Sequence, residues 1–250
     1  MRKMAEVVLE TEGLSKKYGC IMANDHISMK INKGDIYGFI GVNGAGKTTF
    51  MKLICDLIRP TEGRFTLLGA SSTKALAEAR CKMGVLIERP AFYTDMTALQ
   101  NLIIQGRYKN IKPLEGKQTY YDILERVGLS DSIDKRIRDF SMGMKQRLGL
   151  ALCLVGDPEF IVLDEPYVSL DPVGVNEFRT LLLQLNKEGT TILFSCHTLA
   201  EMTKVATRYG FIHKGKLCME LYAEQLEDEM NARNEDLEAF FLRHLEMWKE

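Results

Sequence analysis

Residues 41–48 read Gly-Val-Asn-Gly-Ala-Gly-Lys-Thr and match the phosphate-binding pattern G-x-x-x-x-G-K-[ST]. Glycines allow the tight turn in which successive backbone N–H groups converge on one anion. Lys47 can reach the β- and γ-phosphates of a nucleotide, and the hydroxyl of Thr48 can ligate Mg²⁺. A helix beginning near Gly46 would turn its unpaired amides toward the same phosphates. The residues expected to bind the nucleotide here are Gly41, Val42, Asn43, Gly44, Ala45, Gly46, Lys47, Thr48 and Thr49.

A second group of candidates follows residues 160–163, whose four apolar side chains predict a strand buried on both faces of a parallel sheet. Asp164 and Glu165 then emerge at the C-terminal edge of the sheet, where open α/β sheets bind ligands. Asp164 is suited to support Mg²⁺, and Glu165 to polarise an attacking water as general base. His197 follows another apolar run and could hydrogen-bond the γ-phosphate or that water. The alternatives are a strand that merely ends in acids and a structural histidine.

Two further candidates are individually weak. Tyr18 could stack its ring on an adenine base, although a core or surface tyrosine would look the same in the sequence. Glu88 ends the apolar run at residues 83–87 and could touch Mg²⁺ or its water. A solvated strand end is the commoner role for such a carboxylate.

The elements that must position these residues are predicted from hydrophobic periodicity and turn residues. Strands are expected at residues 7–9, 27–31, 36–40, 64–68, 83–87, 160–163, 190–195, 209–212 and 217–219. Helices are expected at residues 47–59, where Pro60 would end the helix, within 99–154, at 175–185 and within 224–250. Lys214 and Gly215 predict a hairpin turn between the last two strands.

The totals are those of an ordinary globular protein. The chain has 250 residues, a hydrophobic content of 46% and a net charge of −1, so no nucleic-acid partner is expected. Six cysteines lie far apart without a C-x-x-C pair, which favours buried reduced thiols over disulfides or a metal site. Residues 1–6 lack the apolar core of a signal peptide, and the apolar stretch at 148–155 is too short to cross a bilayer. We therefore expect a cytoplasmic protein, for which any membrane association must come through a partner.

Taken together, these motifs resemble the ATP-binding subunit of an ABC transporter over nearly the whole chain. Residues 140–147, Phe-Ser-Met-Gly-Met-Lys-Gln-Arg, are similar to the signature motif of that family. In the family this motif opens a helix whose N-terminus faces the γ-phosphate of ATP held by the other subunit. The resemblance implies that Ser141 and Gly143 make this contact. Met142 and Met144 depart from the pattern, because they replace the first glycine and the glutamine.

The resemblance also implies roles for residues elsewhere. Asp164 and Glu165 would be the magnesium acid and the catalytic glutamate, and His197 would be the switch histidine. Asp171 lies in the stretch similar to the intersubunit loop, and Tyr18 falls where the family has its adenine-stacking aromatic.

Glu88 is a departure, since it stands where the family normally has a glutamine that links magnesium to the membrane partner. A glutamate there, within residues 86–93, is similar to ATPases of lantibiotic-immunity and bacitracin-resistance exporters. This carboxylate would add negative charge near Mg²⁺ and could change the coupling to the permease.

The resemblance implies an α/β fold of the P-loop NTPase type. It would have a RecA-like core with a mixed, mostly parallel sheet, an antiparallel β subdomain and an α-helical subdomain. An ATPase domain is expected at residues 1–222, with the helical subdomain inserted at about 89–158 and a helical tail at 223–250.

The implied function is ATP hydrolysis that powers export of a peptide antibiotic or similar hydrophobic compound through a separate membrane permease. ATP, Mg²⁺, a second ATPase subunit (a homodimer or a close paralogue) and that permease are the expected ligands and partners. The protein would sit on the inner face of the cell membrane. A soluble ABC ATPase that acts as an assembly scaffold is the alternative, and a small-molecule phosphotransferase is a more distant one.

Overall fold

A mixed sheet forms the centre of the molecule in the computed structural model, which describes residues 6–88, 90–111 and 117–248. Its strand order is β5-β6-β7-β3-β8-β9. The strands are β5 (Met83–Leu86), β6 (Phe160–Leu163), β7 (Thr191–Ser195), β3 (Ile36–Ile40), β8 (Arg208–His213) and β9 (Lys216–Tyr222). The pairs from β5 to β8 are parallel, and β9 runs antiparallel to β8. The predicted mixed, mostly parallel sheet is confirmed. Residues 1–5, Arg89 and residues 249–250, to which sequence predictions also applied, lie outside the described part.

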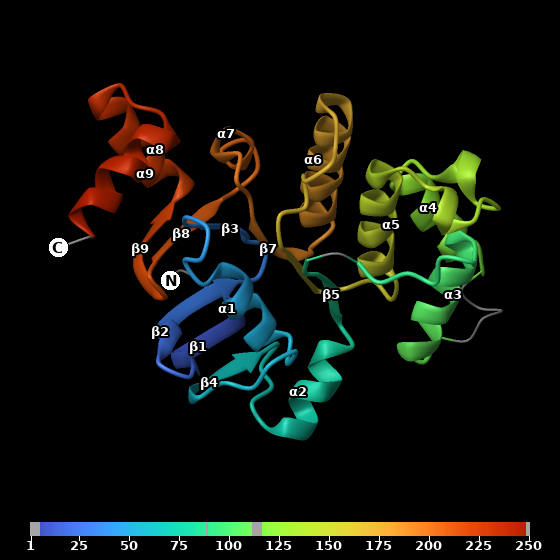
Figure 1. Ribbon diagram of the computed structural model, residues 1–250, viewed down its shortest axis with the longest axis horizontal. Helices are drawn as coiled ribbons and strands as arrows, with labels where there is room; N and C mark the ends of the chain where they lie inside the picture. Colours follow the sequence, from blue (N-terminus) through green and yellow to red (C-terminus); the bar gives the residue numbers. More distant parts are fainter. Residues whose placement is uncertain (1–5, 89, 112–116, 249–250) are drawn as a thin grey trace.

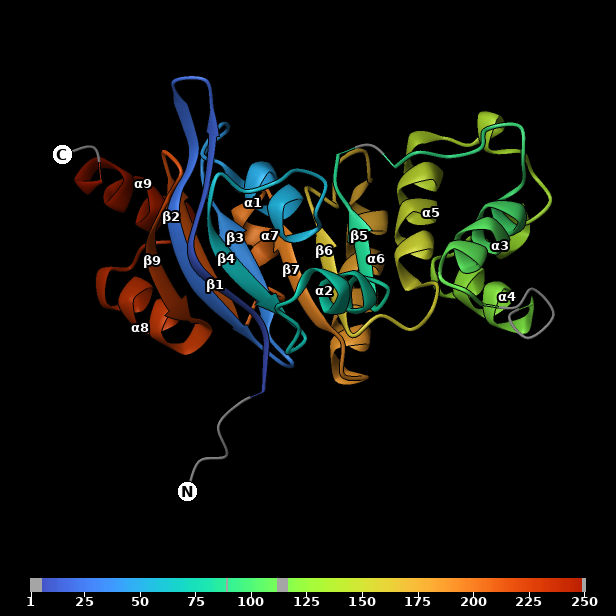
Figure 2. The same cartoon turned by 90° about the horizontal axis from the view of Figure 1, so that it is seen from below.

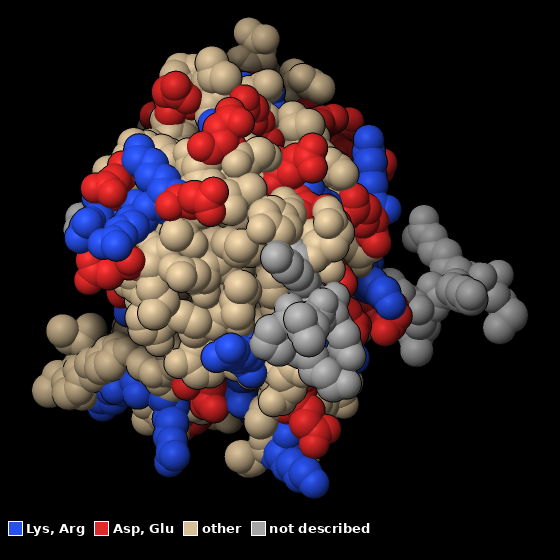
Figure 3. Space-filling model, turned by 90° about the vertical axis from the view of Figure 1, so that its right-hand side faces the viewer, with Lys and Arg blue, Asp and Glu red and all other residues tan. Residues whose placement is uncertain are grey.

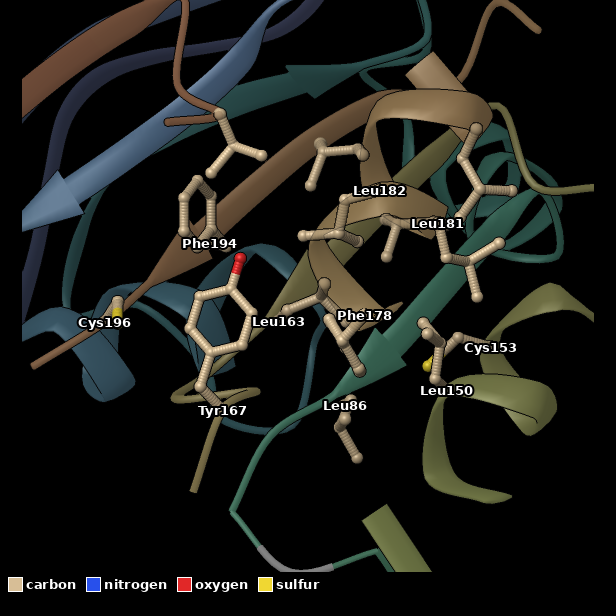
Figure 4. Packing of buried hydrophobic residues seen from close by; sticks show 14 of the residues in the cluster. Leu86, Leu150, Cys153, Leu163, Tyr167, Phe178, Leu181, Leu182, Phe194 and Cys196 are labelled. Atoms are coloured by element: carbon tan, nitrogen blue, oxygen red, sulfur yellow. The ribbon is translucent and has the colours of Figure 1, made fainter. Parts of the chain in front are cut away.

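Both faces of this sheet are covered, which explains the unbroken apolar runs of its strands. Helices α6 (Pro172–Lys187) and α7 (Leu199–Met202) lie on one side, and α1 (Lys47–Ile54) with a second sheet lies on the other (Figure 1). Figure 4 shows the first side, where Tyr167, Phe178 and Phe194 pack together. The rings of Tyr167 and Phe178 meet edge to face with centroids 5.5 Å apart.

The second sheet is antiparallel, in the order β2-β1-β4, as predicted. It consists of β1 (Val7–Tyr18), β2 (Ile21–Asn32) and β4 (Glu62–Leu67). Strand β1 is longer than the predicted 7–9 because buried polar residues hide its continuation. Thr11 donates its hydroxyl hydrogen to the carbonyl of Ile27, and Ser15 accepts the N–H of His26.

Helix α1 is shorter than predicted, and the expectation that it runs to Pro60 is wrong. It ends at Ile54 in a C-terminal cap of the Schellman type. Asp56 adopts a left-handed φ of 59°, and the N–H of Leu57 donates to the carbonyl of Lys52. The apolar Leu57 and Ile58, which extended the helical pattern in the sequence, therefore follow the helix.

A group of helices occupies one end of the molecule and the C-terminal helices occupy the other (Figures 1 and 2). The first group contains α3 (Ala98–Tyr108), α4 (Lys117–Arg126) and α5 (Met142–Leu154), in the region where helices were predicted. Helix α2 (Thr73–Arg80) lies beside β4 and was not predicted, because its eight residues bury just Leu76 and Ala79. Such a short amphipathic pattern is weak in the sequence.

A half-buried lysine joins the helical group to the central sheet. The ammonium of Lys109, at the end of α3, donates to the carbonyl of Met83 at 2.8 Å and to the carbonyl of Val155 at 2.7 Å. Met83 begins β5 and Val155 ends α5. Burial lowers the pKa of Lys109, while nearby thiols oppose that shift. Lys109 thus fastens three elements at one point.

The C-terminal segment forms two helices, α8 (Ala223–Arg233) and α9 (Leu237–Met247). Asn234 separates them with a left-handed φ of 51°. The buried Phe240 packs against Phe211 of β8 with ring centroids 5.7 Å apart. The predicted apolar stripe of this segment therefore covers the edge of the central core.

Leu237→Ala is expected to lower the free energy of unfolding by about 2–3 kcal/mol, because Leu237 is buried against the core. Leu242→Ala, on the same helix, is the matched control, since this leucine is 53% exposed and its change should cost less than about 0.5 kcal/mol. Denaturant unfolding of both variants measures the difference. Equal losses would mean that α9 does not pack as described.

All six cysteines are free thiols, as predicted, but fewer of them are buried than the sequence suggested. Cys153 and Cys196 are buried, whereas Cys20, Cys81 and Cys218 are exposed. Among the described residues, no helix combines the length and the apolar character that a membrane span requires.

Candidate functional site

The predicted phosphate loop, the acidic strand end and the switch histidine converge on one pocket of about 200 Å³. Its walls come from β2, the loop between β3 and α1, and the segments that follow β6 and β7. The lining residues are Ala23, Asn43, Gly44, Ala45, Gly46, Lys47, Thr48, Thr49, Glu165 and His197. The structure therefore brings together most of the candidates that the sequence singled out for phosphate chemistry.

The start of α1 is open to an anion. No side chain caps it, and no acidic residue lies in its first turn. Gly46 precedes it with φ of 109°, and a Cβ atom at this position would lie 2.3 Å from the carbonyl oxygen of Ala23. An L residue does not fit there. The unpaired amides of the first turn are thus left for a ligand.

Lys47 is 6% exposed and lies in the wall of the pocket. Its ammonium donates to the carbonyl of Gly41 at 2.7 Å and to that of Val42 at 3.3 Å. Burial lowers the pKa of Lys47, and the carboxylates of Glu165 and Asp164 counteract this effect. Neutral carbonyls are weak partners for a buried cation, so phosphate oxygens would be better ones.

Oxygen atoms suited to Mg²⁺ lie beside the lysine. The Thr48 hydroxyl donates to Oδ2 of Asp164 at 2.6 Å, and the Ser195 hydroxyl donates to Oδ1 at 2.7 Å. Mg²⁺ prefers such hard oxygen donors and usually takes one or two carboxylates together with substrate phosphates. In the described ranges, no cluster of three or more His, Cys, Asp or Glu could enclose a metal without such a substrate. The donor set fits Mg²⁺ carried by a nucleotide.

Ser195 was not predicted as a site residue. It is fully buried at the end of β7, and its hydroxyl also accepts the N–H of Glu165 at 3.0 Å. It therefore fixes both acids at once. Its position at the end of an apolar run, two residues before His197, was the available signal.

Glu165 and His197 contact each other directly in the wall of the pocket. The N–H of His197 donates to Oε2 of Glu165 at 2.9 Å, and the imidazole Nε2 lies 3.2 Å from Oε1. Burial raises the pKa of Glu165, while His197 and Lys47 work against that shift. Glu165 has a left-handed φ of 53°, an unusual backbone conformation for a glutamate. A carboxylate held in this way can accept a proton from a water in the pocket.

Glu88 lies at the surface. Its carboxylate pairs with the ammonium of Lys52 on α1 at 2.6 Å, and it is absent from the described lining of the pocket. Tyr18 ends β1, is 48% exposed and has the ammonium of Lys16 5.1 Å from its ring centroid. Neither residue is brought into the pocket by this single chain.

The predicted signature residues begin another helix. Ser141 caps α5 by accepting the N–H of Met144 at 3.2 Å, and Gly143 lies in the first turn. Asp171 caps α6 by accepting the N–H of Gly174 at 2.7 Å. Ser141, Gly143, Met144 and Asp171 do not belong to the lining described for the phosphate pocket.

Gln146 connects this helix to the catalytic segment. Its side-chain amide donates to the carbonyl of Pro166 at 2.8 Å, and Pro166 directly follows Glu165. No separate role for Gln146 was predicted from the sequence.

Comparisons with known proteins point in the same direction. Residues 24–168 match the model of the family described as ABC transporter. The bacitracin transport ATP-binding protein BcrA of Bacillus licheniformis is 40% identical over 221 residues, which are 88% of this chain and 71% of that protein. The lantibiotic transport ATP-binding protein SrtF of Streptococcus pyogenes is 36% identical over 228 residues, covering 90% and 96%. A solved nucleotide-free ATP-binding cassette from an ABC transporter has a TM-score of 0.79 and 25% identity, covering 90% and 95%.

Proposed function

The chain belongs to the ABC transporter family and is an ATPase, and on that premise we propose that it powers an exporter through a separate membrane permease. The observation that carries the site assignment is the convergence of the open start of α1, Asp164, Glu165 and His197 on one pocket. The proposed ATPase domain covers residues 1–222, with the helical subdomain at about 89–158 and the tail at 223–250.

The mechanism assigns each side chain a task. The amides at the start of α1 and the ammonium of Lys47 bind the phosphates of ATP and stabilise the charge that develops on them. Thr48 and Asp164 would hold Mg²⁺, which supplies further charge stabilisation when bound. Glu165 orients the attacking water and takes its proton. His197 contacts both Glu165 and the γ-phosphate and fixes their relative positions.

We propose that two copies, or one copy and a close paralogue, enclose two ATP molecules between them. At the start of α5, Ser141 is exposed and Gly143 is half-buried, and this end of the helix would face the γ-phosphate bound by the other copy. Asp171 and its neighbours would line the contact. Because the γ-phosphate then touches both copies, its loss removes contacts that exist in the closed state alone, and the pair reopens.

The membrane partner is proposed to dock in a groove of about 370 Å³ beside α3. The groove is lined by Ala91, Phe92, Tyr93, Asn101, Ile104, Gln105, Tyr108 and Leu152. It lies in the helical group, which forms the right-hand end of the molecule in Figure 1. Figure 3 views the molecule from that end and shows a broad area there without acidic or basic side chains. An apolar permease helix suits such a surface. This contact would hold the protein at the inner face of the cell membrane.

Tyr108→Glu tests this docking, since Tyr108 is 70% exposed at the groove and the change adds a charge without touching the core. The variant should bind ATP as the wild type does but should no longer co-purify with the permease from membranes. Tyr222→Glu, at a tyrosine of β9 that is 49% exposed, should keep the permease. Retention of the permease by the Tyr108 variant would refute the docking site.

The proposed cargo is a peptide antibiotic or a similar hydrophobic compound, because two of the relatives are transport proteins for bacitracin and lantibiotics. Co-expression of the chain with its native permease should raise the tolerance of a sensitive host to bacitracin or a lantibiotic. Unchanged tolerance to both classes, with the complex intact in the membrane, would overturn the cargo. Failure to recover any membrane protein with the chain would favour the scaffold alternative. Phosphate release without an added acceptor separates an ATPase from a phosphotransferase.

A further inference from the structure

The outward-facing carbonyls of the phosphate loop have dedicated partners. A trans peptide unit points its C=O and the following N–H in opposite directions, so an N–H that faces the pocket requires a C=O that faces away. The N–H of Gly215, in the turn between β8 and β9, donates to the carbonyl of Ala45 at 2.9 Å. The side-chain amide of Asn24, on β2, donates to the carbonyl of Gly46 at 3.1 Å. The Gly46 carbonyl also accepts the N–H of Phe50 at 2.9 Å, as the first hydrogen bond of α1. The bonds from Gly215 and Asn24 add to this one in orienting the N–H groups of Gly46 and Lys47.

Asn24 is an unusual residue for its place. Its side chain is fully buried behind the loop, with a relative exposure of 0%. Nδ2 is bonded to Gly46, but Oδ1 has no hydrogen-bond partner among the described residues. A buried acceptor without a partner destabilises the folded state. An apolar side chain of the same shape would avoid this cost, so stability alone does not explain an amide here.

The space around Gly46 leaves little freedom for any other arrangement. A Cβ atom on Gly46 would lie 2.7 Å from Nδ2 of Asn24, besides its contact with the carbonyl of Ala23. Gly215 is equally confined, with a Cβ position 2.9 Å from that same carbonyl. Strand β2, the phosphate loop and the β8–β9 turn are therefore in direct contact. Lys216 pairs with Asp25 between the turn and β2 at 3.3 Å, whereas the Asn24 side chain bonds from β2 to the loop itself.

We propose that Asn24 is a positioning residue for ATP binding, which fixes the peptide between Gly46 and Lys47 so that the Lys47 N–H faces the phosphates. It acts through the loop and does not touch the nucleotide. The inference rests on the proposed assignment of the pocket to ATP. The unpaired Oδ1 of Asn24 lowers the stability of the fold, while its Nδ2 supports ATP binding. Replacing the amide should therefore weaken ATP binding without lowering the stability of the protein.

Asn24→Leu tests the proposal by removing the amide at nearly constant shape. The dissociation constant for ATP, measured by calorimetry, should rise about tenfold, while the thermal unfolding midpoint stays the same or increases. The KM for ATP should rise in parallel, with kcat at saturation within about twofold of the wild type. A merely structural residue would instead lose stability and affinity together.

Thr11→Val is the matched control. Thr11 is another buried polar residue of the antiparallel sheet, but its hydroxyl has both a donor and an acceptor partner on β2. Its replacement should lower the unfolding midpoint and leave the affinity for ATP unchanged. Asn24→Asp, which places a carboxylate beside the carbonyl of Gly46, should weaken ATP binding more than the leucine variant does.

These experiments distinguish the role of Asn24 from the assignment of the pocket to ATP. Wild-type protein that fails to bind ATP would overturn the assignment of the pocket itself. Normal ATP affinity of Asn24→Leu, next to a wild type that binds, would overturn the role of Asn24 alone. Loss of the fold in that variant would also contradict the proposal, because the amide would then be required for stability.

Discussion

Glu165→Gln is expected to lower kcat for ATP hydrolysis by about a thousandfold, while the affinity for ATP stays close to that of the wild type. Glu165 lies in the pocket with His197, and the hydrogen bond described for its carboxylate comes from the His197 N–H, not from the phosphate loop. Glutamine keeps the shape and the bond from the His197 N–H, but it cannot take a proton from water. Phosphate release and calorimetry with ATP measure the two quantities separately.

The same variant should accumulate as an ATP-bound pair, because the γ-phosphate that joins the copies is no longer removed. Size-exclusion chromatography with ATP would detect this form. Glu159→Gln is the matched control, since Glu159 precedes β6 at its opposite end and pairs with Lys82 at the surface. It should hydrolyse ATP normally. Normal turnover of the Glu165 variant would show that another group activates the water.

Lys47→Met should weaken ATP binding at least a hundredfold, because it removes the buried cation of the pocket and leaves the phosphate charge unpaired. The ammonium donates to the Gly41 carbonyl at 2.7 Å and so lies inside the loop that would bind the phosphates. Methionine keeps most of the side-chain volume. Calorimetry with ATP and with ADP measures the loss, which should be larger for ATP because it carries the γ-phosphate.

Lys52→Met is the control for this experiment. Lys52 lies on the same helix, but its ammonium pairs with Glu88 at the surface. The affinity for ATP should change by less than about threefold, as expected for an exposed ion pair. Similar losses in both variants would mean that general positive charge, and not the placement of Lys47, attracts the nucleotide.

The central site was predictable because its residues follow one another in short, regular patterns. A buried strand, a glycine turn and a helix placed Lys47 and Thr48, and the apolar run at 160–163 placed Asp164 and Glu165. The parallel order of the strands then brings their C-terminal ends to one edge. The local sequence and this single topological rule are enough to predict where these residues lie.

Contacts between distant segments were not predictable. Ser195 supports both acids from another strand, and Asn24 reaches the loop from a separate sheet 22 positions earlier in the chain. Their polar side chains carry no period that points to such a partner. The early end of α1 was not predicted for a related reason. Asp56 ends the helix by its left-handed backbone conformation, but the apolar Leu57 after it continues the helical pattern of the sequence.

Lys109 has a consequence for how this chain can vary. Its ammonium holds the helical group to the sheet through the carbonyls of Met83 and Val155, which every amino acid at those positions would still provide. The side chains at positions 83 and 155 can therefore change in evolution without loss of these two hydrogen bonds. A change of Lys109 itself would remove both hydrogen bonds at once and leave the joint to the apolar packing of α5 against β5.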